Sequence, residues 1–107
     1  MAGHTSREKA DIALAREQAN TLIGDATWYG GDQAGSLPWY QAGKTALNDP
    51  ALGSDVRVLK RRAYTTFTVA SSLFGLGRKA EGVALSEAGL AEVERLRRFD
   101  DSASARR

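Results

Sequence analysis

Few residues of this sequence belong to the types that carry out catalysis. Among 107 residues, His4 is the one histidine and there is no cysteine, so neither a Ser-His-Asp nor a Cys-His arrangement can be assembled. A metal site would have to consist of carboxylates alone, and no spacing of the acidic residues suggests one. We therefore expect no enzyme, no cofactor and no metal ion.

One short motif could suggest nucleotide chemistry. Gly43-Lys44-Thr45 matches the end of a P-loop. That motif also needs a glycine five residues before its second glycine, where this chain has Pro38. No strand is evident before the motif, so we attribute the match to chance.

Positive charge is concentrated in one stretch of the chain. The whole sequence has a net charge of +2, but residues 55–79 carry six basic side chains against Asp55 alone, a net charge of +5. Such a concentration is typical of a surface that binds a polyanion. For a single cluster taken alone, a solvated helix face is the simpler interpretation. The six basic residues are Arg57, Lys60, Arg61, Arg62, Arg78 and Lys79.

The elements that must position these residues are mostly helical. Thr5 begins a capping box, and the apolar spacing that follows predicts a helix over residues 6–23. Its apolar face is rich in alanine and buries little area. Gly24 is expected to end this helix.

Two large aromatic residues, Trp28 and Tyr29, fall in residues 25–35, which several glycines mark as a loop. Loops seldom contain large aromatic side chains without packing them. Two interpretations stay open here. Either Trp28 pins the loop onto the core, or the pair forms an aromatic platform for a base or a partner.

A second helix is expected over residues 36–47, with Ser36 as its cap and Pro38 in its first turn. Asp49 can cap a short turn that runs through Leu52. Ser54 or Asp55 then caps the next segment.

Residues 55–76 hold the densest apolar periodicity in the chain, which allows one helix of six turns. Against this, Thr65 and Thr66 belong to a run of β-branched residues that lose rotamer freedom in a helix. Either threonine could instead cap a new helix. The sequence thus permits one helix, or two helices with a break near Tyr64.

The following segment resembles a known family. Leu76-Gly77-Arg78-Lys79 precedes a stretch, residues 83–85, that could form a short strand, and Leu85-Ser86-Glu87-Ala88-Gly89 then opens a helix. This pattern is similar to the wing and final helix of winged-helix regulators such as the MarR kind, over residues 59–98. The resemblance implies a mainly α, small helical domain with a short β-hairpin, of winged helix-turn-helix type.

The resemblance also implies a function, namely DNA-binding regulation with duplex DNA as the partner. Hydroxyl side chains on or near a recognition helix would contact phosphates or base edges, and basic side chains would approach the backbone or form the wing tip. The first and last helices would form a homo-oligomer. The nucleic-acid-binding residues expected on this basis are Arg57, Lys60, Arg61, Arg62, Thr65, Thr66, Thr68, Ser71, Arg78 and Lys79.

The alternative is a small helical structural or interaction subunit, for example of a phage particle or another assembly with protein partners. It accounts for aromatic residues such as Trp28, Trp39 and Tyr40, because aromatic side chains are enriched at protein interfaces. The two hypotheses differ at residues 64–66. A helix break there favours the winged helix, and an unbroken helix favours the assembly subunit.

The length of the chain bounds all of these hypotheses. It predicts a single domain over residues 1–107, with loose ends at about residues 1–5 and 100–107. No apolar run is long enough to span a bilayer, and the N-terminus lacks the apolar region of a secretory signal. We therefore expect a soluble, cytoplasmic protein without a membrane partner.

Overall fold

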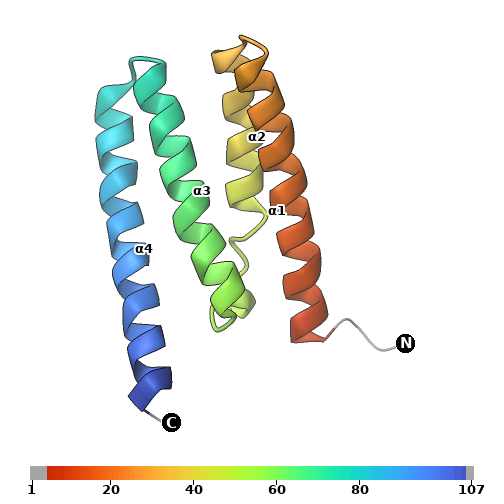
Figure 1. Cartoon of the computed structure of the whole chain (residues 1–107), viewed down its shortest axis with the longest axis vertical. Helices are drawn as coiled ribbons and strands as arrows, with labels where there is room; N and C mark the ends of the chain where they lie inside the picture. Colours follow the sequence, from red (N-terminus) through yellow and green to blue (C-terminus); the bar gives the residue numbers. More distant parts are fainter. Residues whose placement is uncertain (1–4, 106–107) are drawn as a thin grey trace.

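The computed structural model describes the backbone of residues 5–105 and the side chains of residues 5–99. In Figure 1 these residues form four α-helices that run alternately up and down. The helices are α1 (Ser6–Tyr29), α2 (Gln33–Thr45), α3 (Val56–Gly75) and α4 (Lys79–Ala105), with a short 3-10 turn, η1 (Pro50–Leu52), before α3. The prediction of a mainly α domain is confirmed, and the described residues contain no strand, hairpin or wing.

The helices form a flat arrangement in which α2 lies between α1 and α3, and α4 lies on the far side of α3 (Figure 1). The molecule measures 45 × 36 × 18 Å along its principal axes. α1 packs mainly on α2, and α4 packs mainly on α3. Because α4 stands at the edge, it has one main packing partner.

Side-chain caps begin the elements largely as the sequence predicts. The Thr5 hydroxyl accepts a hydrogen bond from the backbone N–H of Glu8 at 3.1 Å. The Asp49 carboxylate accepts one from Ala51 at 2.9 Å, and this bond starts η1. Asp55, rather than Ser54, caps α3 by accepting from the N–H of Arg57 at 2.9 Å.

The first two helices differ from the prediction in where they meet. α1 continues through Gly24 to Tyr29, because Gly24 is a packing position: a methyl group there would lie 2.7 Å from the ring of Tyr40. Asp32 caps α2, accepting from the N–H of Gly35 at 2.8 Å, so the predicted cap at Ser36 is wrong. The loop shrinks to residues 30–32, and Trp28 and Tyr29 belong to the last turn of α1.

α3 is a single helix with no break at residues 64–66. The hydroxyl of Thr65 donates to the carbonyl of Arg62 at 3.1 Å, and that of Thr68 donates to the carbonyl of Tyr64 at 2.9 Å. These bonds within the helix satisfy the hydroxyls without interrupting it. Of the two alternatives that the periodicity left open, the structure shows the unbroken helix.

A tight turn joins α3 to α4 where the sequence suggested the start of a wing. Gly77 adopts a positive φ of 79°, and the N–H of Arg78 bonds back to the carbonyl of Leu73 at 2.9 Å. This is the Schellman pattern, which ends a helix at a residue in the left-handed region. α4 then begins at once, at Lys79.

The predicted strand over residues 83–85, and the predicted helix start at Ser86, are wrong because α4 runs through both. Gly82 and Gly89 are seven residues, about two helical turns, apart on the side of α4 that faces α3. A methyl group at Gly82 would lie 3.1 Å from the ring of Phe74, and one at Gly89 would lie 2.9 Å from the ring of Phe67. These glycines therefore serve close helix packing, a tertiary role that a local pattern does not distinguish from a strand or turn signal.

Two clusters of buried side chains stabilise the fold. The first joins one half of α1 to η1 and the start of α3 through residues such as Leu14, Leu47 and Val58. The second joins α2 to α3 through Leu37, Tyr40, Val69 and Leu73, and Trp28 packs against it. Within the described residues, no helix is both long enough and apolar enough to cross a lipid bilayer.

Candidate functional site

Two of the six basic residues predicted to contact DNA, Arg57 and Arg61, lie in the seam between α1 and α3, two helices that run parallel. At its start, the Arg57 guanidinium donates to the Asp11 carboxylate of α1 at 2.8 Å and to the Asp55 carboxylate at 2.9 Å. Asp55 thus both caps α3 and binds the first basic side chain of that helix.

Arg61 lies one turn further along the seam and bonds to Glu17 of α1. Its guanidinium donates to both carboxylate oxygens, at 2.8 Å for the Nη2–Oε2 pair. Glu17 is fully buried, with 0% of its side chain exposed, and it also accepts from the hydroxyl of Thr21 at 2.6 Å. Since a buried carboxylate without a cation is costly, Arg61 stabilises the contact between α1 and α3.

Other basic side chains also contact their own chain. Arg62 donates to the backbone carbonyls of Leu47 and Asp49, each at 2.8 Å, and so holds the segment that joins α2 to η1. Arg78 forms an ion pair with Glu81 in the first turn of α4. Lys60 and Lys79 are exposed.

The electrostatics of the seam match these contacts. The hydrogen bond from Arg57 lowers the pKa of Asp55 below its ordinary value, although partial burial acts in the opposite direction. The bonds to Asp55 and Asp11 raise the pKa of Arg57, and the bond to Glu17 raises the pKa of Arg61. These pKa shifts favour the charged forms of Asp55, Arg57 and Arg61.

The four hydroxyl residues predicted to contact DNA divide into two pairs. Thr65 and Thr66 are buried, and the hydroxyl of Thr66 donates to the Glu92 carboxylate of α4 at 2.9 Å. Thr68 and Ser71 lie on another side of α3 and line a pocket. The structure brings this second pair together with Trp28 and Tyr29, which lie some forty residues earlier in the sequence.

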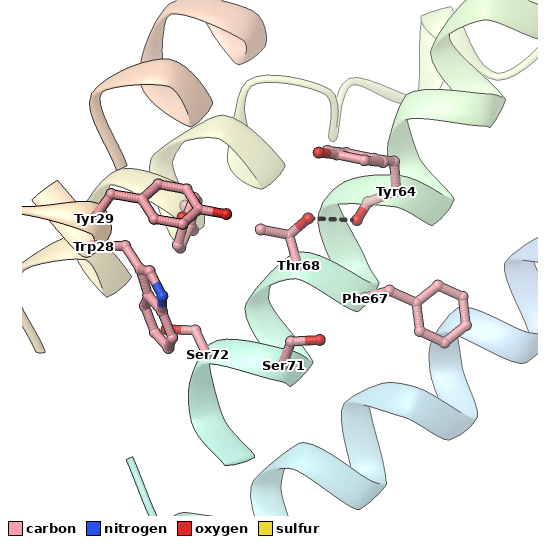
Figure 2. Close-up of a pocket in the computed structure, with 8 residues that line it drawn as sticks. Trp28, Tyr29, Tyr64, Phe67, Thr68, Ser71 and Ser72 are labelled. Carbon is pink, nitrogen blue, oxygen red and sulfur yellow. Dashed lines mark hydrogen bonds between the residues drawn. The ribbon is translucent and has the colours of Figure 1, made fainter. Parts of the chain in front are cut away.

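This pocket has a volume of about 340 Å³. It lies between the C-terminal end of α1 and the later part of α3 (Figure 2). Most of its wall is aromatic. We call it the aromatic pocket and define it by its lining residues. These are Trp28 and Tyr29 from α1, Tyr40 from α2, and Tyr64, Phe67, Thr68, Ser71 and Ser72 from α3.

The aromatic walls are held in place by contacts outside the pocket. The ring of Trp28 lies against Gly75, where a methyl group would come within 2.8 Å of it. The Tyr40 hydroxyl donates to the Asp25 carboxylate at 2.7 Å, and burial together with this bond raises the pKa of Tyr40 above its ordinary value. The guanidinium of Arg61 stacks on the Tyr64 ring, 4.2 Å from its centroid. The predicted packing role of Trp28 is thus observed, and its ring also lines a pocket.

One polar group in the pocket wall has no partner. The side chain of Ser72 is buried, with 2% of the residue exposed, and its hydroxyl makes no hydrogen bond. Figure 2 shows it beside the ring of Trp28. A hydroxyl in this situation retains a free donor and a free acceptor.

A second surface with an unusual composition is on α4. Val83, Leu90, Val93 and Phe99 are all exposed on this helix, although apolar side chains on an edge helix usually turn towards its neighbour. Leu90 is exposed to 63%. Among the described side chains of the whole molecule, no group of three or more His, Asp or Glu is placed to hold a metal ion.

We compared the chain with protein-family models, with curated proteins and with solved structures, and none of these comparisons found a match. The function must therefore be argued from the residues themselves. The resemblance to winged-helix regulators gains no support from the comparisons.

Sequence reasoning missed several residues that matter at these sites, above all Glu17 and Ser72. Glu17 did carry a signal, because it falls at helical spacing on the same face of α1 as Leu14, Thr21 and Gly24. A carboxylate on a buried face requires a cation from elsewhere in the fold. Ser72 carried no such signal, since the pocket beside it is formed by three separate helices.

Proposed function

We propose that this chain is a small helical assembly subunit that pairs with a second copy of itself through the exposed apolar side chains of α4. The observation that carries the proposal is the exposure of Leu90 and its neighbours Val83 and Val93 on a helix with one main packing partner. Contiguous apolar side chains in water are unfavourable, and surfaces of this kind mark protein contacts.

The spacing of these residues favours a helical partner. Val83 and Leu90 are seven residues apart, and Val93 follows three residues later. This is the spacing of a seam between two helices, in which apolar residues recur on one stripe. From the sequence, we expected an assembly subunit to have an unbroken helix at residues 64–66, and α3 is unbroken there.

The charges along α4 favour a second copy as the partner. Its first part carries the exposed acidic side chains Glu81, which pairs with Arg78, and Glu87. Its later part carries Arg95, Arg97 and Arg98, of which Arg97 and Arg98 lie 3.9 and 3.5 Å from Glu94 of the same helix. If two α4 helices pack antiparallel around a two-fold axis, the acidic part of each faces the basic part of the other. A chain that is complementary to itself in this way needs no other partner.

The test is the oligomeric state in solution, measured by sedimentation equilibrium from about 5 to 500 μM. We expect a monomer–dimer equilibrium that Leu90→Glu shifts at least about tenfold towards the monomer, because the interface would have to bury a charge. Leu22→Glu is a matched control, since Leu22 on α1 is exposed to 67% and lies away from α4.

A monomer over the whole concentration range would contradict the pairing. So would a dimer that both variants weaken equally, because the contact would then not lie on α4. A capture experiment with Leu90→Glu as the negative control would follow in the first case, to look for a different protein partner.

DNA binding, which the sequence predicts, stays the second candidate. Arg57, Arg61 and Arg62 contact their own chain, so the exposed Lys60 and Lys79 are better placed to meet a phosphate. Fluorescence anisotropy with a labelled random duplex, at low and at moderate salt, tests this candidate. Binding that weakens steeply with salt, and that Lys60→Ala with Lys79→Ala reduces, would support it.

A further inference from the structure

We infer that the aromatic pocket binds a small, neutral, planar aromatic molecule that carries a hydrogen-bonding group at its edge. The site lies between α1 and α3 and is distinct from the α4 surface proposed above, so it does not depend on pairing. The inference combines the shape of the pocket, the exposed hydroxyl of Ser71 and the charges around the pocket.

The size and the walls of the pocket fit one flat ring system. A volume of about 340 Å³ lies at the lower end of the range for small-molecule sites, which are mostly apolar with a few polar groups. In Figure 2, Trp28 and Tyr29 approach from α1 and face Thr68 and Ser71 on α3. Aromatic walls favour a ligand with its own π-system, because offset stacking and edge-to-face contacts add to the burial of area.

The mouth of the pocket is built to change on binding. Tyr29 is exposed to 86%, so its ring has little contact with the rest of the protein. Trp28, by contrast, is fixed against Gly75. A ligand that stacks on Trp28 could therefore be covered by Tyr29 without any movement of the helices.

The hydroxyl of Ser71 supplies the polar requirement, because Ser71 lines the pocket and is exposed. It can donate to, or accept from, a polar group at the edge of a ligand. The Ser72 oxygen is buried beside Trp28, so a ligand in the pocket does not reach it. An aliphatic hydrocarbon could not bond to the Ser71 hydroxyl, which is why we specify a ring with a polar edge.

The charges around the pocket favour a neutral ligand. None of the eight lining residues has a charged side chain. Of the charged groups nearby, Arg61 is bonded to Glu17, and Asp25 accepts from the Tyr40 hydroxyl at 2.7 Å. A charged ligand would therefore lose its hydration without meeting a counter-charge in the lining. Aromatic pockets that bind ammonium ions rely on free ring faces, whereas Arg61 already stacks on the Tyr64 ring.

The experiment uses the two indole N–H signals of the ¹⁵N-labelled protein, which arise from Trp28 and Trp39 and are assigned with Trp39→Phe. Indole and adenosine are the aromatic probes, and cyclohexanol and tetramethylammonium are the comparison compounds. We expect a saturable shift of the Trp28 signal with at least one aromatic probe, while the Trp39 signal stays in place, because Trp39 does not line the pocket.

Two variants then test the residues. Tyr29→Ala should weaken binding at least about fivefold through the loss of stacking, and its exposed position leaves the fold intact. Ser71→Ala should weaken it about two- to tenfold through the loss of one hydrogen bond. Circular dichroism checks that both variants stay helical.

The inference is overturned if neither aromatic probe gives a saturable shift up to about 10 mM, a range that a well-fitting fragment should reach. It is also overturned if the Trp39 signal moves with that of Trp28, if tetramethylammonium or cyclohexanol binds as well as the aromatic probes, or if Tyr29→Ala binds as the unchanged protein does.

Discussion

The seam between α1 and α3 has two ends of opposite character. At the lower end, acidic residues of α1 meet basic residues of α3, in the pairs Asp11 with Arg57 and Glu17 with Arg61. At the upper end, Trp28 and Tyr29 of α1 face the hydroxyls of α3 across an open pocket. Because α1 and α3 are parallel, their N-terminal halves lie side by side, and so do their C-terminal halves.

The difference shows how one helix can serve two purposes. The positive charge of residues 55–79 suggested a DNA surface, and two of its six basic residues, Arg57 and Arg61, bond to α1. Thr68 and Ser71, which were expected to contact a nucleic acid, line an aromatic pocket. We therefore expect changes at the lower end to alter stability, and changes at the mouth of the pocket to alter binding.

The largest expected effect comes from Arg61→Ala, which leaves the Glu17 carboxylate buried without its cation. We expect the free energy of unfolding to fall by about 3 kcal/mol, the cost typical of breaking a buried ion pair. Urea denaturation followed by circular dichroism measures it.

Lys60→Ala is the neighbouring control, and its effect should stay within about 0.5 kcal/mol because Lys60 is exposed. If the two variants were equally mild, the lower end of the seam would not be structural. Arg61 would then be available for a polyanion after all.

A smaller effect is expected at the upper end from Tyr40→Phe. This change removes the bond from the Tyr40 hydroxyl to the Asp25 carboxylate and should lower the free energy of unfolding by about 1 kcal/mol. Asp25 is only partly buried, so water can replace part of the lost bond. The same urea experiment measures the loss.

Tyr29→Phe is the matched control, since it also removes one tyrosine hydroxyl but at the exposed mouth of the pocket. We expect no measurable change in stability from it. Equal losses in both variants would mean that the bond between Tyr40 and Asp25 does not stabilise the upper end.

The smallest effect concerns the pH dependence of the lower end. The folded pKa of Asp55 lies below its unfolded value, so the bond to Arg57 contributes stability above the unfolded pKa of about 3.9 and loses it as the pH falls through the folded value. Asp55→Asn keeps a good helix cap but removes the charge.

The free energies of unfolding of the two proteins should therefore differ by about 0.5 kcal/mol at pH 6 and converge below about pH 4. Urea denaturation at a series of pH values between 6 and 2.5 follows this difference. A difference that stays constant across the series would show that ionisation of Asp55 is not its cause.

The sequence was a good guide wherever a structural signal is local. The caps at Thr5 and Asp49 were predicted correctly, because each depends on a side chain and a backbone N–H a few residues away. The turn at Gly77 was also marked, by the residue that most easily adopts a positive φ.

The sequence was a poor guide wherever a glycine or an aromatic residue serves packing between helices. Gly24 was assigned to a helix end, and Gly82 directly precedes the stretch that was read as a possible strand. In the structure, the rings of Tyr40 and Phe74 pack against these two glycines. The aromatic pocket could not be foreseen as a unit, because Trp28 and Ser72 come from different helices.

By itself, the sequence determined that this is a mainly helical chain, where α1 and α3 begin, and that its positive charge is concentrated in residues 55–79. Only the tertiary structure decided what those charges face. Asp11 and Glu17 lie 46 and 44 residues before their arginine partners, and nothing in either local pattern announces the other. Packing through α2 sets the register of the parallel helices α1 and α3. This register pairs their charged residues at one end of the seam and leaves an open aromatic pocket at the other.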